Sequence, residues 1–247
     1  MSDIKIEREG GVLEIRFNRP AKKNAITNSM YGALADALES AGPDAETRAI
    51  LFTAEGDFFT AGNDLVDFAA QSSGAFEGPR HVGRFLQLMI EAEKPIVAAV
   101  QGHAVGVGVT MLLHCDLVYI AEAAKLTTPF IDLGLVPENA SSLTLVERLG
   151  HARAFAMLGL GEPLLGRDAA AYGIANAALL GPEVEAAARA AAQALAKKPV
   201  ESLRLTKTLM RKRKRLMRRM QKEGELFAER LTSPEAKAAF AAFLGRR

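Results

Sequence analysis

Short apolar runs recur through the first half of the chain and predict β-strands. The first two runs are separated by the pair Gly10-Gly11, and runs joined across such a pair predict a β-hairpin. The later runs are almost continuously apolar, which is typical of buried strands. The runs are residues 4–8, 12–18, 49–53, 95–100 and 116–121.

Apolar residues at helical spacing lie between these runs and predict helices. We expect one helix from Asn28 or Ser29 to Glu39, capped by one of those two polar residues. A second helix is expected over residues 80–93, and residues 63–79 before it are predicted as a loop-rich segment. The order strand, turn, helix, strand predicts an α/β core with largely buried strands.

The pattern becomes helical in the last part of the chain. Helices are expected to begin at residue 141 or 142, to follow residues 150, 199 and 234, and to cover residues 183–196. We place a boundary near residue 196, between a core of residues 1–196 and a helical region of residues 197–247. Since no low-complexity linker marks this boundary, the helical region is expected to pack against the core.

Composition excludes several classes of protein. The chain has 247 residues, a net charge of +2 and one cysteine, so neither a polyanion binder, a disulfide framework nor a four-cysteine zinc site is expected. The four histidines lack metal-ligand spacing, and no metal site is expected. Residues 1–10 carry no signal-like apolar segment, and the glycine-interrupted residues 95–113 do not suit a membrane span. We therefore expect a cytoplasmic protein without a membrane partner.

Three segments stand out as candidates for chemistry, namely residues 59–65, 102–108 and 134–142. The first two place glycines after a strand, and the second leads into a helix whose first N–H groups favour negative charge. N–H groups from two such turns form an oxyanion hole. The third holds Glu138 among apolar residues, a setting that raises a carboxyl pKa and suits a general base. The residues by themselves leave open that the glycines are ordinary turns and that Glu138 caps a helix.

Several short motifs, taken together, are specific enough to indicate a protein family. They are Asn18-Arg19-Pro20, Lys23-Asn24-Ala25, Ala61-Gly62-Asn63-Asp64-Leu65, Gly102-His103-Ala104-Val105-Gly106, Gly134-Leu135-Val136-Pro137-Glu138 and Ser233-Pro234-Glu235-Ala236. With them, nearly the whole chain resembles the crotonase, or enoyl-CoA hydratase/isomerase, superfamily. The resemblance implies a spiral of ββα turns followed by a helical trimerisation region, assembled as homotrimers or dimers of trimers. It also implies an acyl-CoA thioester substrate and an enolate stabilised at the thioester oxygen.

The resemblance assigns the oxyanion hole to the backbone N–H groups of Asn63 and Val107. Hydratases of this superfamily use two glutamates to activate water, and Thr110 and Phe130 stand at those positions here. Neither side chain replaces a water-activating carboxylate. Glu138 matches the single catalytic glutamate of the Δ3,Δ2-enoyl-CoA isomerase branch. The resemblance therefore implies an isomerase in which Glu138 moves a proton from C2 to C4 of the substrate.

Coenzyme A is then a handle of the substrate, and neither a cofactor nor a metal is expected. Phe243 and Arg246 match positions near the end of the chain that contact CoA in the family. In many members these residues come from a neighbouring subunit. The residues that the resemblance assigns to substrate and CoA binding are Lys22, Lys23, Ala25, Ala61, Asp64, Leu65, Phe130, Phe243 and Arg246.

Two alternatives stay open. In the first, Glu138 serves hydration or another enolate-forming step. In the second, the chain is a CoA- or RNA-binding member, an alternative that rests on the basic residues 211–219. Helical geometry spreads these charges around much of the helix circumference, beside an apolar stripe. We therefore expect the basic residues to form a solvated face near CoA phosphates or a trimer edge rather than a nucleic-acid interface. Five further residues are expected to be structural or solvated: His103 and Asp116 structural, Cys115 buried, Asp64 ordering its loop, and Asp67 solvated.

Overall fold

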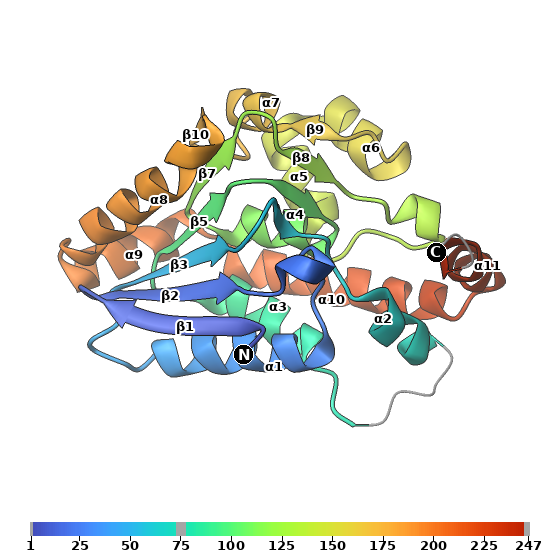
Figure 1. Ribbon diagram of the computed structural model, residues 1–247, viewed down its shortest axis with the longest axis horizontal. Coiled ribbons are helices and arrows are strands. Elements are labelled where there is room, and N and C mark those ends of the chain that lie inside the picture. The colour runs from blue at the N-terminus through green and yellow to red at the C-terminus, as the bar shows by residue number, and fades with distance from the viewer. Residues whose placement is uncertain (1, 73–77, 245–247) are drawn as a thin grey trace.

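The computed structural model describes residues 2–72 and 78–244 (Figure 1). The larger sheet has the strand order β1 (Ile4–Glu9), β2 (Val12–Phe17), β3 (Ala49–Ala54), β5 (Ile96–Val100), β7 (Leu117–Ala121) and β10 (Ala177–Leu179). The smaller sheet has the order β4 (Phe58–Thr60), β6 (His103–Val105), β8 (Lys125–Thr127) and β9 (Leu164–Leu165). From β3 to β8 the chain alternates between the two sheets, and this arrangement is the predicted α/β spiral.

Strand pairing follows the apolar pattern of the sequence. In the larger sheet, the pair β1–β2 is the predicted antiparallel hairpin, and the neighbouring strands β2, β3, β5, β7 and β10 pair in parallel. Every residue of β3 and β5 is buried. Continuously apolar runs are what strands need when both faces of the sheet are covered.

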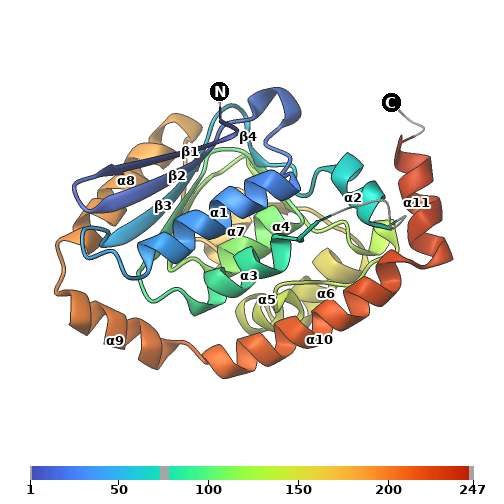
Figure 2. The same ribbon diagram turned by 90° about the horizontal axis from the view of Figure 1, so that it is seen from below.

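Helices cover both faces of the larger sheet (Figure 2). The helices are α1 (Asn28–Ala41), α2 (Leu65–Ser72), α3 (Val82–Glu91), α4 (Val107–Thr110), α5 (Ser141–Leu149), α6 (His151–Gly159), α7 (Gly166–Ala171), α8 (Gly181–Ala196), α9 (Val200–Met210), α10 (Arg213–Leu231) and α11 (Pro234–Leu244), with 3₁₀ turns at Pro20–Lys22, Met111–His114 and Ile131–Leu133. Helix α8 packs on β3, β5 and β7, whereas α1 pairs with α3 on the other side. Within residues 2–72 and 78–244, no helix combines the length and apolar character that crossing a membrane requires.

The start of α1 differs from the prediction. Thr27 is the capping residue, rather than Asn28 or Ser29, because its backbone is extended and its Oγ1 accepts a hydrogen bond from Met30 N at 3.3 Å. Asn28 is already helical, and its N–H donates to Asp67 Oδ2 at 2.8 Å. The prediction that Asp67 is solvated is therefore also wrong, since its carboxylate satisfies a free N–H group at the helix start.

Residues 65–72, predicted as part of a loop, form α2. Asp64 Oδ1 accepts a hydrogen bond from Val66 N at 3.0 Å and orders this helix start, as expected for Asp64. Further along, β9 and β10 interrupt the stretch predicted as helical, because they pair with β8 and β7. Such pairing depends on distant strands, so a local helical pattern does not reveal it.

The helical tail bends between residues 199 and 234, where one helix was expected to follow residue 199 and the structure has two. Between α9 and α10, Arg211 has an extended backbone and donates to the carbonyl oxygens of Met89 and His114. Just before the bend, Lys207 Nζ donates to Asp116 Oδ2 at 2.7 Å. Asp116 thus has the structural role that we expected, and the tail packs against the core. The boundary at residue 196 stays a prediction.

Candidate active site

Two tight turns, one after β4 and one after β6, are packed against each other. Gly62 has φ +82°, and a Cβ atom there would lie 2.7 Å from the carbonyl oxygen of Val105. A Cβ on Gly108 would lie 2.4 Å from Thr60 Cγ2. A side chain at Gly62 would push the two backbones apart, and one at Gly108 would displace the side chain of Thr60. Gly62 and Gly108 therefore serve close packing of the two turns.

This packing brings together the two residues predicted to form an oxyanion hole. Asn63 follows Gly62, and Val107 is the first residue of α4. Among the described residues, neither the N–H group of Asn63 nor that of Val107 donates a hydrogen bond to a protein acceptor. Both N–H groups thus remain available to a ligand, which is what an oxyanion hole requires.

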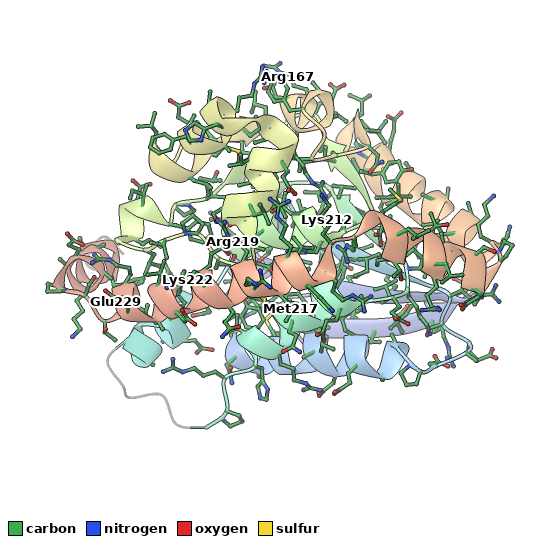
Figure 3. The ribbon with its side chains drawn as sticks, turned by 180° about the vertical axis from the view of Figure 1, so that it is seen from behind. Arg167, Lys212, Met217, Arg219, Lys222 and Glu229 are labelled. Carbon is green, nitrogen blue, oxygen red and sulfur yellow. The ribbon has the colours of Figure 1, made fainter. Side chains whose placement is uncertain are left out.

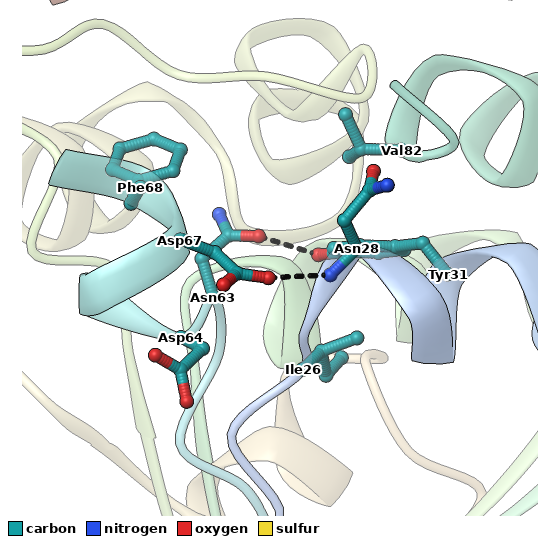
Figure 4. A pocket seen from close by; sticks show the side chains of 8 residues that line it. All are labelled: Ile26, Asn28, Tyr31, Asn63, Asp64, Asp67, Phe68 and Val82. Carbon is teal, nitrogen blue, oxygen red and sulfur yellow. Dashed lines mark hydrogen bonds between the residues drawn. The ribbon is translucent and has the colours of Figure 1, made fainter. Parts of the chain in front are cut away.

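The side chain of Asn63 is fixed by a buried phenol (Figure 4). Tyr31, from α1, is 3% exposed and its hydroxyl donates to Asn63 Oδ1 at 2.6 Å. Burial and the nearby Glu138 carboxylate raise the pKa of Tyr31 well above its usual value, so the phenol stays protonated and remains a donor. Tyr31 was not identified from the sequence, because a tyrosine on an amphipathic helix looks like an ordinary core residue.

Glu138 lies in the loop before α5, with only 9% of its surface exposed. Burial raises its pKa to about 8, a hydrogen bond from Thr110 opposes this rise, and the charge of Glu223 adds to it. The Thr110 hydroxyl donates to Glu138 Oε1. The arrangement is that of a carboxylate tuned to accept a proton near neutral pH.

The backbone after Glu138 is held in an unusual conformation. Asn139 and Ala140 both lie in the left-handed region, with φ of +59° and +57°. His114 Nε2 lies 2.8 Å from the Asn139 carbonyl oxygen, and burial lowers the pKa of His114 to about 3. A neutral imidazole must donate through Nε2 to make this bond, so His114 fixes the loop. This role of His114 was not predicted from the sequence.

A second buried carboxylate lies near Glu138 and was also missed. Glu223, from α10, is 5% exposed and accepts a hydrogen bond from Ser142 N at 3.0 Å. Glu223 is far from Glu138 in the sequence. It also lies in a strongly charged helix, where a solvated side chain is the usual expectation.

The residues assigned to CoA lie at one edge of this site. Lys23 O accepts a hydrogen bond from Ala61 N at 2.9 Å, so the turn that holds Lys22, Lys23 and Ala25 runs beside the loop after β4. Lys22 and Lys23 are exposed, and Lys23 Nζ lies 4.9 Å from the centre of the Phe58 ring. Exposed lysines of this kind attract negatively charged groups.

The other assigned residues have protein partners or lie outside the description. Asp64 Oδ2 accepts a hydrogen bond from Arg19 Nη1 at 2.7 Å, which fixes the loop. Leu65 packs against an apolar cluster that contains Phe130, and Phe130 is buried. Two assigned positions lie outside the described residues: the side chain of Phe243 and the whole of Arg246.

The predictions for His103 and Cys115 are also confirmed. His103 Nδ1 accepts a hydrogen bond from Lys125 N at 3.0 Å, which is a structural role, and Cys115 is buried. In the described part of the chain, no group of three or more histidine, cysteine, aspartate or glutamate side chains is arranged to hold a metal ion. Within the basic stretch, Arg215 pairs with Glu147 at 2.6 Å while Leu216 points inward, so these charges do surround a helix with an apolar side.

Comparisons with known proteins converge on one family. Residues 7–247 match the family described as Enoyl-CoA hydratase/isomerase. The Rattus norvegicus protein named Enoyl-CoA delta isomerase 2 is 39% identical over 85% of this chain and 54% of its own length, so this chain spans about half of that relative. The Bacillus subtilis (strain 168) protein named Probable enoyl-CoA hydratase is 33% identical over 93% of this chain and 90% of its own. The solved structure of Pseudomonas aeruginosa OdaA has a TM-score of 0.94 and 44% identity, covering 99% of both chains.

Proposed function

The chain belongs to the enoyl-CoA hydratase/isomerase family, and we propose that within it this protein is an enoyl-CoA isomerase. The substrate is a 3-enoyl-CoA thioester, and the product is the conjugated 2-enoyl-CoA. The reaction moves one proton from C2 to C4, so it needs one base that later acts as the acid. It requires no metal or redox cofactor, and coenzyme A stays part of the substrate.

Glu138 is the base in this proposal. Its carboxylate removes the C2 proton, and the resulting negative charge spreads onto the thioester oxygen. The N–H groups of Asn63 and Val107 donate to that oxygen, where charge develops in the transition state. The protonated Glu138 then returns the proton at C4. A pKa of about 8 suits both steps, because the group is readily ionised and readily protonated near neutral pH.

The observation that carries the proposal is the pairing of Glu138 with Thr110. A threonine hydroxyl stands against the buried carboxylate where a hydratase would place a second glutamate. Phe130, at the other hydratase position, is buried in an apolar cluster. With a carboxylate at neither hydratase position, proton transfer within the substrate is favoured over the addition of water.

The test is an absorbance assay with 3-hexenoyl-CoA that follows formation of the conjugated product. Hydration of 2-hexenoyl-CoA is measured in parallel. Conjugation without hydration is the expected result, and Glu138→Gln should abolish it while leaving binding of the acyl-CoA nearly unchanged. Hydration without conjugation would overturn the proposal.

One observation favours hydration as a second candidate. Glu223 is a second buried carboxylate whose charge acts on Glu138, so the site is not chemically limited to one acid. Incubation of 2-hexenoyl-CoA in water labelled with heavy oxygen separates the two reactions, because only hydration introduces the label into the product.

We also propose that the protein works as a homotrimer or a dimer of trimers. Helix α9 carries large apolar side chains at the surface, and Leu209 and Met210 are 87% and 79% exposed. Side chains of this size favour an interface between copies over contact with water. Light scattering with size-exclusion chromatography gives the mass in solution, and a monomer would refute this assembly.

A further inference from the structure

Helix α5 begins directly after the Glu138 loop and has no capping residue of its own. The residue at the capping position is Ala140, which carries no side-chain acceptor and has φ +57°. The first N–H groups of a helix have no partner within the helix, and at a buried start they need an acceptor from elsewhere. The conformation of the loop with Glu138 therefore depends on the group that supplies this acceptor.

Glu223 supplies it from the tail. Its Oε1 accepts hydrogen bonds from Ser142 N at 3.0 Å and from Ser142 Oγ at 2.5 Å. Burial raises the pKa of Glu223, whereas the hydrogen bonds from Ser142 and the nearby backbone amide of Ala140 oppose this rise. A carboxylate at this position both accepts from the free N–H groups and complements the positive end of the helix dipole.

Contacts from the rest of α10 hold Glu223 in place. Arg219, one turn earlier, donates from Nη1 to Ser142 Oγ at 3.0 Å. Leu216, a further turn back, is buried in a cluster with Ala140 and Leu143. Figure 3 shows α10 crossing the back of the molecule, with Arg219 and Lys222 along it. Three successive turns of the tail helix thus contact the start of α5.

We propose that Glu223 is a positioning residue that holds the Glu138 loop by capping α5 from the tail. The inference rests on the proposed function, because Glu138 matters only if it is the base. It makes the carboxyl-terminal helices part of the active site, since the general base is held by a group 85 residues further along the chain.

Glu223 also acts on Glu138 through its charge. The groups that face Glu138 are the hydroxyls of Thr110 and Tyr31 and the carboxylate of Glu223, and Arg219 faces Glu223 from its own helix. A negative neighbour disfavours ionisation of Glu138 and raises its pKa. Removing that charge while keeping the hydrogen bonds should lower the pKa of Glu138.

The test compares Glu223→Ala, Glu223→Gln and a matched control, Glu225→Gln. Glu225 lies on the same helix with its side chain 55% exposed, so this control removes the same charge without touching the cap. The readouts are hydrogen exchange at the Ser142 amide, titration of the Glu138 carboxyl by carbon-13 NMR, and the pH profile of kcat/KM for 3-hexenoyl-CoA.

We expect Glu223→Ala to speed exchange at Ser142 by roughly tenfold or more and to lower kcat more than it raises KM. Glu223→Gln keeps an acceptor oxygen, so it should largely preserve Ser142 protection while moving the titration of Glu138 and the acidic limb of kcat/KM to lower pH. The control should change none of these. If both Glu223 variants match the control in exchange and titration, the inference is wrong. A wild-type protein that does not conjugate 3-hexenoyl-CoA would instead refute the proposed function, while exchange and titration would still decide the role of Glu223.

Discussion

Replacing Thr110 by valine tests how the pKa of Glu138 is set. Valine keeps the shape of threonine but removes the hydroxyl that donates to Glu138 Oε1. A hydrogen bond to a charged group contributes about 1.5–3 kcal/mol, and one pKa unit corresponds to about 1.4 kcal/mol. Because this bond favours the ionised form, its loss should raise the pKa of Glu138 by roughly 1–2 units from its present value of about 8.

The expected effect on activity depends on pH in a defined way. At pH 7 roughly a tenth of wild-type Glu138 is ionised, and the variant should have about 10–100 times less of the active form. The value of kcat/KM for 3-hexenoyl-CoA should fall by the same factor at pH 7. At sufficiently alkaline pH the two enzymes should converge, because both bases are then ionised.

The control for this experiment is Thr110→Ser, which restores a hydroxyl at the same position and should restore most of the wild-type pH profile. A loss of kcat/KM that is equal at every pH would show that Thr110 acts on packing rather than on the ionisation of Glu138. No loss at any pH would show that the Thr110 hydroxyl does not set the ionisation of Glu138.

Three further changes should have separate signatures. The pKa of Glu138 is about 8 in the folded state and near 4.5 in the unfolded chain, so stability is lost as pH rises between these values. Glu138→Gln should therefore abolish turnover. In denaturant titrations, its free energy of unfolding relative to wild type should be higher at pH 9 than at pH 4, by at most about 5 kcal/mol. The same difference from wild type at both pH values would contradict this. Tyr31→Phe removes the donor to Asn63 and should lower kcat by roughly tenfold with little change in binding of the acyl-CoA, and an unchanged kcat would show that the side chain of Asn63 needs no support. Gly62→Ala should cost roughly 1–3 kcal/mol of stability as well as activity, since the methyl group meets a carbonyl oxygen at positive φ; Gly224→Ala, in open space on α10, should instead be neutral or stabilising in the same unfolding assay.

The sequence predicted the parts of the fold that depend on local pattern. The strands at residues 49–54 and 96–100 were expected almost to the residue, because continuous apolar runs have few other solutions. Helix α2 was missed, although Asp64 stands just before it as an ordinary helix cap. The strands β9 and β10 were missed for another reason, since a strand of two or three residues is defined by its partner rather than by its own sequence.

In the candidate site, too, residues in local motifs were predicted and residues that depend on distant contacts were not. Glu138, Asn63 and Val107 lie in short motifs, and they could be selected from the sequence through the resemblance of those motifs to a family. Tyr31, His114 and Glu223 act through contacts between distant elements, and their residue types are common in a core or on a charged helix. No local pattern separates such residues from their ordinary counterparts, so only the fold reveals them.

The four residues from Glu138 to Ser141 combine several features that oppose folding. Glu138 is buried with a raised pKa, and Asn139 and Ala140 are non-glycine residues at positive φ. Each left-handed residue costs of order 1 kcal/mol or more, and a buried carboxylate adds to this cost as pH rises. A loop with these costs keeps its conformation only when its surroundings favour it, and here they are the neutral His114 and the cap from Glu223. Since the cap comes from α10, mutations that weaken the packing of this helix should reduce the activity of Glu138 before they unfold the sheets.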